Sequence, residues 1–175
     1  MILTGKLIEK EVKKNRITIS PFLEENINPN SYNFRLDKYL KVYKGSLLDS
    51  KKNCEYELIE IPKEGYILQP NKLYLANTVE RLGSKKYVPT YNARSSVARL
   101  GLFINLSATL CDIGFEGQIT MQLYSVNPVK IYPYMNIGQI MFWKPLGKIN
   151  LYKGKYQGST GVQTTKIYQD FEKDK

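Results

Sequence analysis

Short stretches in which apolar and polar residues alternate run through most of the chain. The alternation begins near position 17, and turn residues separate one stretch from the next. Alternation places every second side chain on one face of a strand, so the pattern predicts many short strands. The predicted strands are 17–19, 39–43, 56–61, 66–68, 72–76, 118–124, 130–132 and 139–143. Many short strands with frequent turns indicate a mainly β protein, built as a sandwich, jelly roll or distorted β-barrel.

A short helix precedes these strands. Apolar residues between Leu3 and Val12 repeat at i, i+4 and i+5 spacing, which is typical of one face of a helix. Thr4 stands just before them as a candidate N-cap. The pattern therefore predicts an amphipathic N-terminal helix from about 5 to 14 that packs on the sheet.

Length and composition indicate one globular domain. The chain has 175 residues, of which 42 % are hydrophobic and 24 % are charged, as in ordinary globular proteins. A domain of this size buries about 70 % of its unfolded surface and needs no disulfide to fold. We predict a single domain, 1–175, whose polar, glycine-containing stretch 152–175 forms a flexible C-terminal arm. Such an arm is either disordered or orders over a ligand or a neighbouring subunit.

Two absences exclude several kinds of chemistry. The chain has no histidine, which removes serine–histidine and cysteine–histidine catalysis and every histidine-containing zinc site. The two cysteines, Cys54 and Cys111, are far apart and form no CxxC pair. Neither a four-cysteine zinc site nor the zinc centre of the usual base deaminases can therefore form, and we expect no zinc. Two unpaired cysteines are typical of a reducing cytoplasm.

The chain carries a surplus of positive charge. Lys and Arg number 26 against 16 Asp and Glu, a net charge of +10. This favours nucleic acid, an anionic membrane surface or a phosphorylated small molecule as partner. No apolar run is as long as a membrane span and charges interrupt the N-terminal stretch, so we expect a cytoplasmic protein without membrane contact. The tyrosines stand in strand-like positions, which disfavours nucleic acid.

One stretch combines hydroxyls and guanidinium groups. Residues 95–100 are expected to form a short helix whose N-terminus is capped by Ser95 or Ser96. Together with Arg94, the free N–H groups at this helix start make a candidate phosphate cradle, and Arg99 could reach a second polar group. The alternative is a capped surface helix with two solvated arginines.

The middle of the chain is nearly uncharged. Residues 103–117 read as a hairpin-like run that closes in a glycine-flanked turn. Between Arg99 and Lys144 the only carboxylates are Asp112 and Glu116. A lone carboxylate between apolar strands usually has a partner or a function, so Asp112 is a candidate site residue.

Four ordered motifs carry a resemblance. They are RSSVARLGL at 94–102, DxGFxGxIT at 112–120, PxMxIGQ at 133–139 and KYQG at 155–158. Together they resemble the dCTP deaminase family of the trimeric dUTPase-like superfamily. The resemblance implies a distorted β-barrel or jelly roll of the dUTPase-like type and a homotrimer with active sites between subunits. It also implies a C-terminal arm that closes over the triphosphate.

The resemblance implies nucleotide-binding residues. It places Arg94, Ser95 and Ser96 at the phosphates, with Lys155 and Tyr156 as further phosphate contacts from the arm. Catalysis at the base requires no metal, and Mg²⁺ enters with the triphosphate.

The resemblance also implies how base and sugar are read. The backbone from Leu106 to Ala108 reads the pyrimidine edge, Asp112 binds the 3′-hydroxyl, and the Phe115 ring packs against deoxyribose. Ser159 stands where the family usually has Gln, which removes one long donor from the arm.

Gln122 is the main departure from the family pattern. The family carries a Glu here, the general acid/base that activates the water attacking C4 of cytosine and protonates the departing ammonia. A glutamine keeps the hydrogen-bonding shape but cannot carry the proton, and such a loss lowers a rate by about 10²–10⁴. The implied catalytic set is Gln122 with Ser95 and Arg99, which help to hold base and water.

The resemblance implies hydrolytic deamination of dCTP to dUTP and ammonia in pyrimidine deoxynucleotide synthesis, and we predict this function. One alternative is a dUTP or dCTP diphosphatase in which Asp112 orients the water, and another is a catalytically silent nucleotide-binding regulator. Glu116 is a weaker replacement base because it is expected in a solvent-facing turn. dTTP is a candidate inhibitor.

Overall fold

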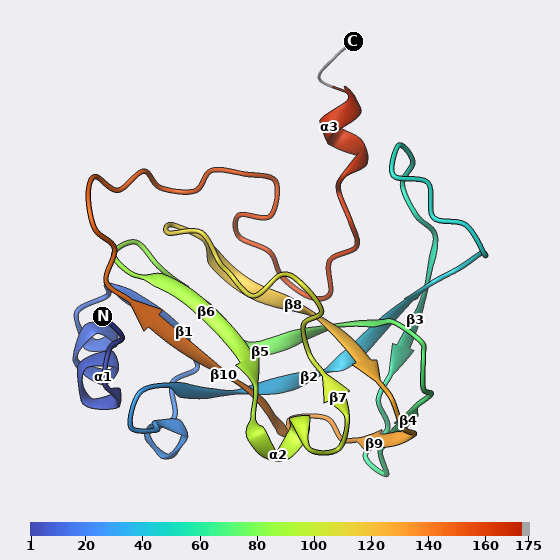
Figure 1. Ribbon diagram of the computed structural model, residues 1–175, viewed down its shortest axis with the longest axis horizontal. Coiled ribbons are helices and arrows are strands. Elements are labelled where there is room, and N and C mark those ends of the chain that lie inside the picture. The colour runs from blue at the N-terminus through green and yellow to red at the C-terminus, as the bar shows by residue number, and fades with distance from the viewer. Residues whose placement is uncertain (173–175) are drawn as a thin grey trace.

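A computed structural model describes residues 1–172 (Figure 1). Its helices and strands are α1 (Gly5–Lys13), β1 (Ile17–Ser20), the 3₁₀ turn η1 (Glu24–Asn26), β2 (Tyr32–Tyr43), β3 (Tyr56–Glu60), β4 (Tyr66–Leu68), β5 (Tyr74–Ser84), β6 (Val88–Ala93), α2 (Ser95–Ala98), β7 (Leu102–Phe103), β8 (Glu116–Ser125), β9 (Val129–Ile131), β10 (Asn136–Trp143) and α3 (Tyr168–Glu172). None of the helices in the described part of the chain is long and apolar enough to cross a membrane.

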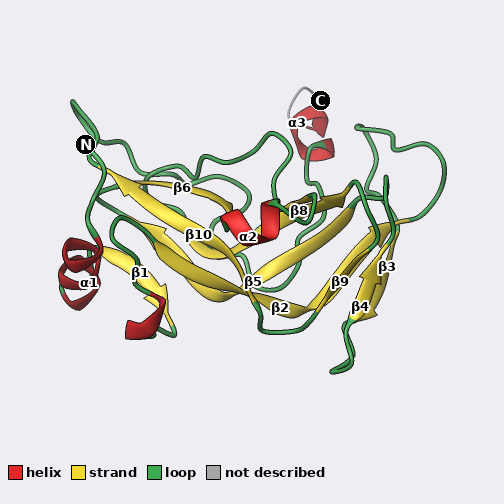
Figure 2. Cartoon of the chain, turned by 60° about the horizontal axis from the view of Figure 1, so that its bottom comes forward, coloured by secondary structure: helices red, strands yellow, loops and turns green. Residues whose placement is uncertain are grey.

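The strands form one strongly bent antiparallel sheet. Its order is β6-β10-β2-β5-β8-β7, with β1 added to β5, β3 added to β2, and β4 and β9 forming a separate pair (Figures 1 and 2). The β2–β5 register shifts between Leu36 and Leu40, and the β5–β8 register shifts between Asn77 and Arg81. Such irregularities bend a strand and increase its twist, which lets the sheet curve toward a barrel. The predicted mainly β, distorted barrel-like fold is confirmed.

Strand β8 shows why the sequence folds in this way. Its side chains alternate strictly between buried and half-buried. Met121 and Leu123 are fully buried in the core, whereas the polar side chains between them face the opposite side of the sheet. The same alternation that buries the apolar set therefore lines up Gln118, Thr120 and Gln122 on one surface.

The predicted N-terminal helix and the helix near 95–100 are both present, as α1 and α2. Thr4 occupies the N-cap position of α1, although its side chain makes no capping hydrogen bond. The predicted serine cap of α2 is wrong. Its N-cap is Arg94, whose carbonyl accepts hydrogen bonds from the N–H groups of Val97 and Ala98, so both serines lie inside the first turn.

The predicted hairpin over 103–117 is also wrong. Phe103 at its start belongs to β7, and Glu116 and Gly117 at its end already belong to β8, with which β7 pairs farther along. The residues between them cross as a loop to β6, where Leu110 forms an isolated bridge with Thr90. Thr90 also accepts a hydrogen bond at 2.7 Å from the indole Nε1 of Trp143. The loop is therefore held to the β6–β10 end of the sheet.

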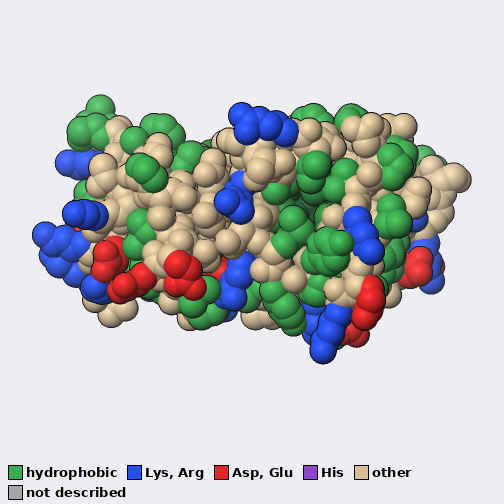
Figure 3. Space-filling model, turned by 90° about the horizontal axis from the view of Figure 1, so that it is seen from below, with side chains coloured by type: hydrophobic (Ala, Val, Ile, Leu, Met, Phe, Trp, Pro, Cys, Tyr) green, Lys and Arg blue, Asp and Glu red, His purple; other side chains and the backbone are tan. Residues whose placement is uncertain are grey.

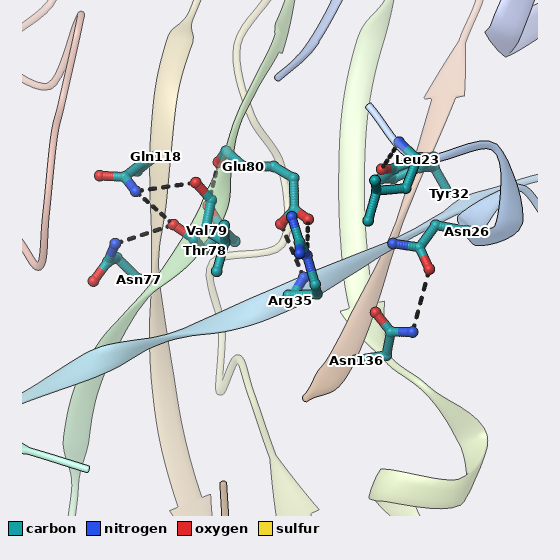
Figure 4. A network of polar contacts seen from close by, with 10 residues as sticks. All are labelled: Leu23, Asn26, Tyr32, Arg35, Asn77, Thr78, Val79, Glu80, Gln118 and Asn136. Atoms are coloured by element: carbon teal, nitrogen blue, oxygen red, sulfur yellow. Dashed lines mark hydrogen bonds and ion pairs between the residues drawn. The ribbon is translucent and has the colours of Figure 1, made fainter. Parts of the chain in front are cut away.

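A buried ion pair joins β2 to β5 (Figure 4). The side chain of Glu80 is fully buried and accepts hydrogen bonds from the backbone N–H of Arg35 at 2.9 Å and from its Nε at 2.7 Å. Nearby, the Gln118 amide donates to the carbonyls of Thr78 and Val79 at 2.8 and 3.2 Å. This network ties β8 to the bend of β5, where the ladder itself is interrupted.

The C-terminal arm lies against the sheet as far as Thr165, and α3 then projects away from it (Figures 1 and 2); positions 173–175 lie outside the described residues. The carbonyl of Ser159 accepts a hydrogen bond from the backbone N–H of Gln118 at 2.8 Å. Farther along, the N–H of Gln163 donates to the Thr120 hydroxyl at 3.0 Å, and the N–H of Thr165 donates to the Tyr43 hydroxyl at 2.8 Å. The arm thus covers the polar side of β8, while its mobility in solution stays a prediction.

Candidate active site

A cavity of about 430 Å³ opens between β8, the loop after β7 and the arm. This volume lies in the range of small-molecule sites, about 300–1,000 Å³. Its walls come from four parts of the chain: Tyr43, Leu75 and Tyr91 from other strands; Ala108, Leu110, Cys111, Asp112 and Phe115 from the loop; Gln118, Ile119, Thr120 and Gln122 from β8; and Tyr152, Tyr156, Ser159, Gln163, Thr164 and Thr165 from the arm.

Three polar side chains of β8 face this cavity, and they differ in what they already bind. The side-chain Oε1 of Gln118 accepts a hydrogen bond from the N–H of Gly161, and the Thr120 hydroxyl accepts one from the N–H of Gln163. Both side chains are therefore engaged by the arm. Gln122 makes no arm contact of this kind among residues 1–172; its Oε1 accepts a hydrogen bond from the backbone N–H of Leu106 at 3.2 Å.

Asp112 is the one carboxylate among the residues that line the described cavity. Its side chain is exposed. Phe115, three residues later, packs edge-on against Tyr152 of the arm with ring centroids 6.2 Å apart. Glu116 lies outside the cavity, because its carboxylate contacts the Thr18 hydroxyl at 2.6 Å and Lys85 Nζ at 3.5 Å. These contacts make Glu116 a poor replacement for a base at position 122.

The loop leaves peptide groups free beside Gln122. The carbonyl of Thr109 accepts a hydrogen bond from the N–H of Tyr91, and the N–H of Cys111 donates one to the carbonyl of Pro89. These two hydrogen bonds hold the loop on β6. Within the described chain, the peptide groups of Ser107 and Ala108 have no backbone partner. Ala108 lines the cavity, so the loop offers backbone donors and acceptors to a ligand there.

Two titratable side chains in the wall stay protonated at neutral pH. Burial, with a contribution from the charge of Asp112, raises the pKa of the Cys111 thiol to about 12. Burial also raises the pKa of Tyr91. Cys111 is therefore a poor nucleophile. Among residues 1–172 no group of three or more Cys, Asp or Glu side chains is arranged to hold a metal ion.

The arm brings two of its predicted site residues into the cavity wall, Tyr156 and Ser159. The Ser159 hydroxyl donates to the Tyr156 carbonyl at 2.6 Å. Lys155 does not line the cavity, because its Nζ pairs with the Asp170 carboxylate at 2.6 Å. A phosphate contact from Lys155 requires this ion pair to open.

The predicted α2 residues lie away from the cavity of the same chain. Arg94 is half-buried, while Ser95, Ser96 and Arg99 are exposed, and none of them lines the wall. α2 lies at the lower edge of the sheet in Figure 1, and the arm lies at the upper side. Leu106 touches the site through its backbone N–H only. The roles of these residues stay predictions.

Sequence reasoning missed most of the wall. Strand alternation through Gln122 was the signal for Gln118 and Thr120, which share its face. Tyr43 and the arm residues Gln163 and Thr165 meet only through long-range packing. No local pattern marks such contacts.

Comparison with known proteins agrees with this architecture. Residues 2–145 match the family described as dCTP deaminase-like, and the chain belongs to this family. It is 46 % identical over 173 residues to the dUMP-forming dCTP deaminase of Hathewaya histolytica, covering 98 % of this chain and 100 % of that protein. It is 49 % identical to that of Clostridium botulinum strain Eklund 17B, with 99 % and 100 % covered. The corresponding protein of Cytophaga hutchinsonii is 42 % identical, with 99 % and 100 % covered.

A solved structure shares the fold. The 2′-deoxycytidine 5′-triphosphate deaminase from Agrobacterium tumefaciens superposes with a TM-score of 0.65 at 16 % sequence identity. The match covers 81 % of this chain and 47 % of that one, so this chain spans about half the length of the Agrobacterium protein. At this identity the likeness bears on the fold alone.

Proposed function

We propose that the chain binds a pyrimidine deoxynucleoside triphosphate in this cavity and releases pyrophosphate from it, leaving the monophosphate. The observation that carries the proposal is that the cavity lining contains a single carboxylate, Asp112, while position 122 holds the carboxamide of Gln122. Similarity over the whole length to dUMP-forming dCTP deaminases supports the substrate class.

Formation of dUMP from dCTP takes two hydrolyses. In one, water replaces the amino group at C4 and ammonia leaves; in the other, water cleaves the triphosphate and pyrophosphate leaves. The first needs a group that moves a proton at the base, and the second needs a group that orients water near the phosphates. Asp112 can orient water as a carboxylate, whereas the amide of Gln122 cannot carry a proton.

The cavity wall suggests how the nucleotide lies. Gln122 and the free peptide groups at Ala108 offer hydrogen bonds to the base. Phe115 provides an apolar surface for the deoxyribose, and Asp112 stands where it can meet the 3′-hydroxyl and a water molecule. Tyr156 of the arm then lies toward the phosphates, and closure of the arm excludes solvent from the reaction.

A neighbouring copy of the chain completes the phosphate site in this proposal. The cavity contains no Lys or Arg among its described lining residues, although a triphosphate needs cationic partners. Exposed apolar side chains surround α2: Leu100, Phe103, Leu106 and Val126. Figure 3 shows apolar side chains gathered on the lower face, the face of α2 in Figure 1. Packing of this face in a homotrimer would bring Arg94, Ser95, Ser96 and Arg99 to the cavity of another copy.

Mg²⁺ belongs to the substrate in this scheme. It arrives bound to the triphosphate and neutralises part of the phosphate charge. Asp112 is the one carboxylate of the described wall that could reach it through water. We propose the cytoplasm as the place of action, in keeping with the free thiols of Cys54 and Cys111.

A second candidate is deamination of dCTP to dUTP and ammonia. The observation that favours it is identity of 46–49 % over nearly the whole chain to proteins named dCTP deaminase, dUMP-forming, whose name includes the deamination of dCTP. With an amide at position 122, we expect the deamination rate to lie about 10²–10⁴-fold below that of a carboxyl-bearing enzyme.

The two reactions are separated by their products. The purified chain is incubated with dCTP or dUTP and Mg²⁺, and ammonia and pyrophosphate are measured together. We expect pyrophosphate from the unchanged chain and little ammonia. Gln122→Glu is expected to raise ammonia release from dCTP, and Asp112→Asn is expected to lower pyrophosphate release by about 10²-fold or more.

Other outcomes would contradict the proposal. Rapid ammonia release by the unchanged chain would show that position 122 needs no carboxyl and would favour the deaminase. Tight nucleotide binding with neither product would favour a silent regulator. Pyrophosphate release that survives Asp112→Asn would assign the water-orienting role to another residue.

A further inference from the structure

We propose that Gln122 makes this cavity select pyrimidines with a carbonyl at C4, uracil or thymine, over cytosine. The inference rests on the proposed function and names the base class that it leaves open. It follows from the orientation of the Gln122 side-chain amide. A hydrogen bond from one backbone N–H group fixes that orientation.

The oxygen of the Gln122 amide is turned toward the loop. The backbone N–H of Leu106 lies 3.2 Å from Oε1 of Gln122. A peptide N–H can only donate, so the atom facing it must be the amide oxygen. The reversed orientation would place an NH₂ group against an N–H group, which leaves two donors without an acceptor.

The amide nitrogen therefore remains for the ligand. Gln122 is half-buried and lines the cavity. Its Oε1 is engaged by Leu106, and its Nε2 donates to no group within residues 1–172. A half-buried NH₂ group without a protein acceptor requires a hydrogen-bond acceptor on the ligand that occupies the space beside it.

The surroundings of this NH₂ favour the edge of a base. The free peptide groups of Ser107 and Ala108 follow directly on Leu106 in the loop. On β5, the residue paired with Gln122 is Leu75, which gives the wall an apolar side. The face of a flat ring can pack on the apolar wall while the donors and acceptors along its edge bond the unpaired peptide groups. Small-molecule sites generally combine apolar walls with a few polar groups in this way.

The C4 substituent distinguishes the bases at this point. Uracil and thymine carry a carbonyl oxygen at C4, which accepts a hydrogen bond from an NH₂ group. Cytosine carries an amino group at C4. This group and the NH₂ group of Gln122 would then face each other as two hydrogen-bond donors without an acceptor. A carboxylate at position 122 has the opposite preference, because one oxygen accepts the Leu106 N–H and the other can accept the cytosine amino group.

The test measures affinity with pyrophosphate release blocked, and ammonia is measured in parallel because Gln122→Glu is expected to deaminate the dCTP analogue. Isothermal titration is carried out with the α,β-imido analogues of dUTP and dCTP, whose bridging nitrogen resists cleavage, at fixed Mg²⁺. For the unchanged chain we expect the dUTP analogue to bind about tenfold or more tightly than the dCTP analogue, because the mismatched pair leaves a desolvated polar group unpaired. Gln122→Glu is expected to reverse this order, and Gln122→Leu is expected to abolish the preference.

Charge and folding are controlled separately. Gln69→Glu makes the same change in charge at an exposed position outside the cavity wall, and it should retain the original preference. Thermal unfolding checks that each variant is folded. A misfolded Gln122→Leu would leave the comparison between Gln122 and Gln122→Glu decisive.

The outcomes separate this inference from the function beneath it. Equal affinity of the unchanged chain for both analogues, or a preference for the dCTP analogue, overturns the role of Gln122 and leaves pyrophosphate release standing. Binding of neither analogue overturns the proposed function and this inference with it. Reversal of the preference by Gln122→Glu but not by Gln69→Glu supports both.

Discussion

The backbone of Ser159 in the arm lies directly on Gly117 of β8. A Cβ atom at position 117 would stand 2.9 Å from the Ser159 nitrogen and 3.0 Å from its oxygen. Only a residue without a side chain lets the arm approach the strand this closely. The contact lies next to the cavity wall. The close packing of the arm on β8 therefore depends on the absence of a side chain at position 117.

Gly117→Ala is therefore expected to lift the arm. The added methyl group cannot fit without a shift of the arm backbone, and overpacking of this kind costs about 1–3 kcal/mol. We expect trypsin to cleave after Lys153 or Lys155 several-fold faster than in the unchanged chain, while the far-ultraviolet spectrum of the sheet is retained. An unchanged cleavage rate would show that the arm is not held at this point.

If Lys155 contacts phosphate, as the resemblance implies, its ion pair with Asp170 competes with that ligand. Asp170→Asn removes the carboxylate and frees Lys155, so we expect triphosphate affinity to rise by up to about fivefold, in line with the small free energy of exposed pairs. The gain should shrink at high salt. Asp49→Asn is the matched control, since Asp49 pairs with Lys52 outside the cavity at 3.6 Å. An equal gain in both variants would point to net charge instead.

The buried carboxylate of Glu80 is expected to be a major determinant of stability. Glu80→Ala leaves the Arg35 guanidinium without its buried partner, a change that costs about 3–5 kcal/mol. Glu60→Ala breaks the exposed pair with Lys38 and should cost at most about 1 kcal/mol. Urea unfolding of both variants measures the difference. A similar loss in the free energy of unfolding for both variants would mean that the Arg35 guanidinium binds another group or becomes hydrated when Glu80 is removed.

Acid sensitivity is expected to depend partly on Glu11. A hydrogen bond from Arg16 lowers the pKa of this carboxyl, opposed by burial and assisted by the Tyr87 hydroxyl, which donates at 2.8 Å. Because the folded pKa is depressed, the stabilisation is complete above the unfolded value of about 4.3 and is lost as the pH falls through the folded value. The free energy of unfolding should differ most between the unchanged chain and Glu11→Gln at pH 7, and least near pH 3. A constant difference across that range would contradict this assignment.

The two cysteines should differ in reactivity. Burial raises the pKa of Cys111 to about 12, so only about one thiol in 10⁴ is ionised at pH 8, and the thiolate is the reactive form. We expect iodoacetamide at pH 8 to alkylate Cys54 in the native protein and both cysteines in urea, as read by peptide mass spectrometry. Fast labelling of native Cys111 would indicate an opened cavity.

Alternation of side chains predicted the strands where one face is buried, as in β8. It failed where the sheet bends: the register shifts near Leu36 in β2 and near Arg81 in β5 interrupt the period and hide the full length of both strands. It also missed β6, which contains Pro89 and Asn92, residues that disfavour a strand. The sheet accepts them because β10 supplies the pairing partner.

The candidate site was accessible to sequence reasoning in the loop and on β8. Asp112 stood out as a carboxylate in an uncharged stretch, and Gln122 stood out against a family pattern. The direction of the Gln122 amide could not be foreseen, because it depends on the N–H of Leu106 in a segment that the sequence led us to expect as a hairpin. Turn chemistry and long-range packing, rather than local pattern, decide such contacts.

The chain contains a single tryptophan. Its indole is bonded to Thr90, and Thr90 bridges Leu110 in the cavity wall. Indole emission depends on local polarity and hydrogen bonding, so a movement of this loop is transmitted to Trp143 through one side chain. The protein thus carries its own optical probe, with which the proposed entry of a nucleotide can be followed in real time on an unlabelled chain.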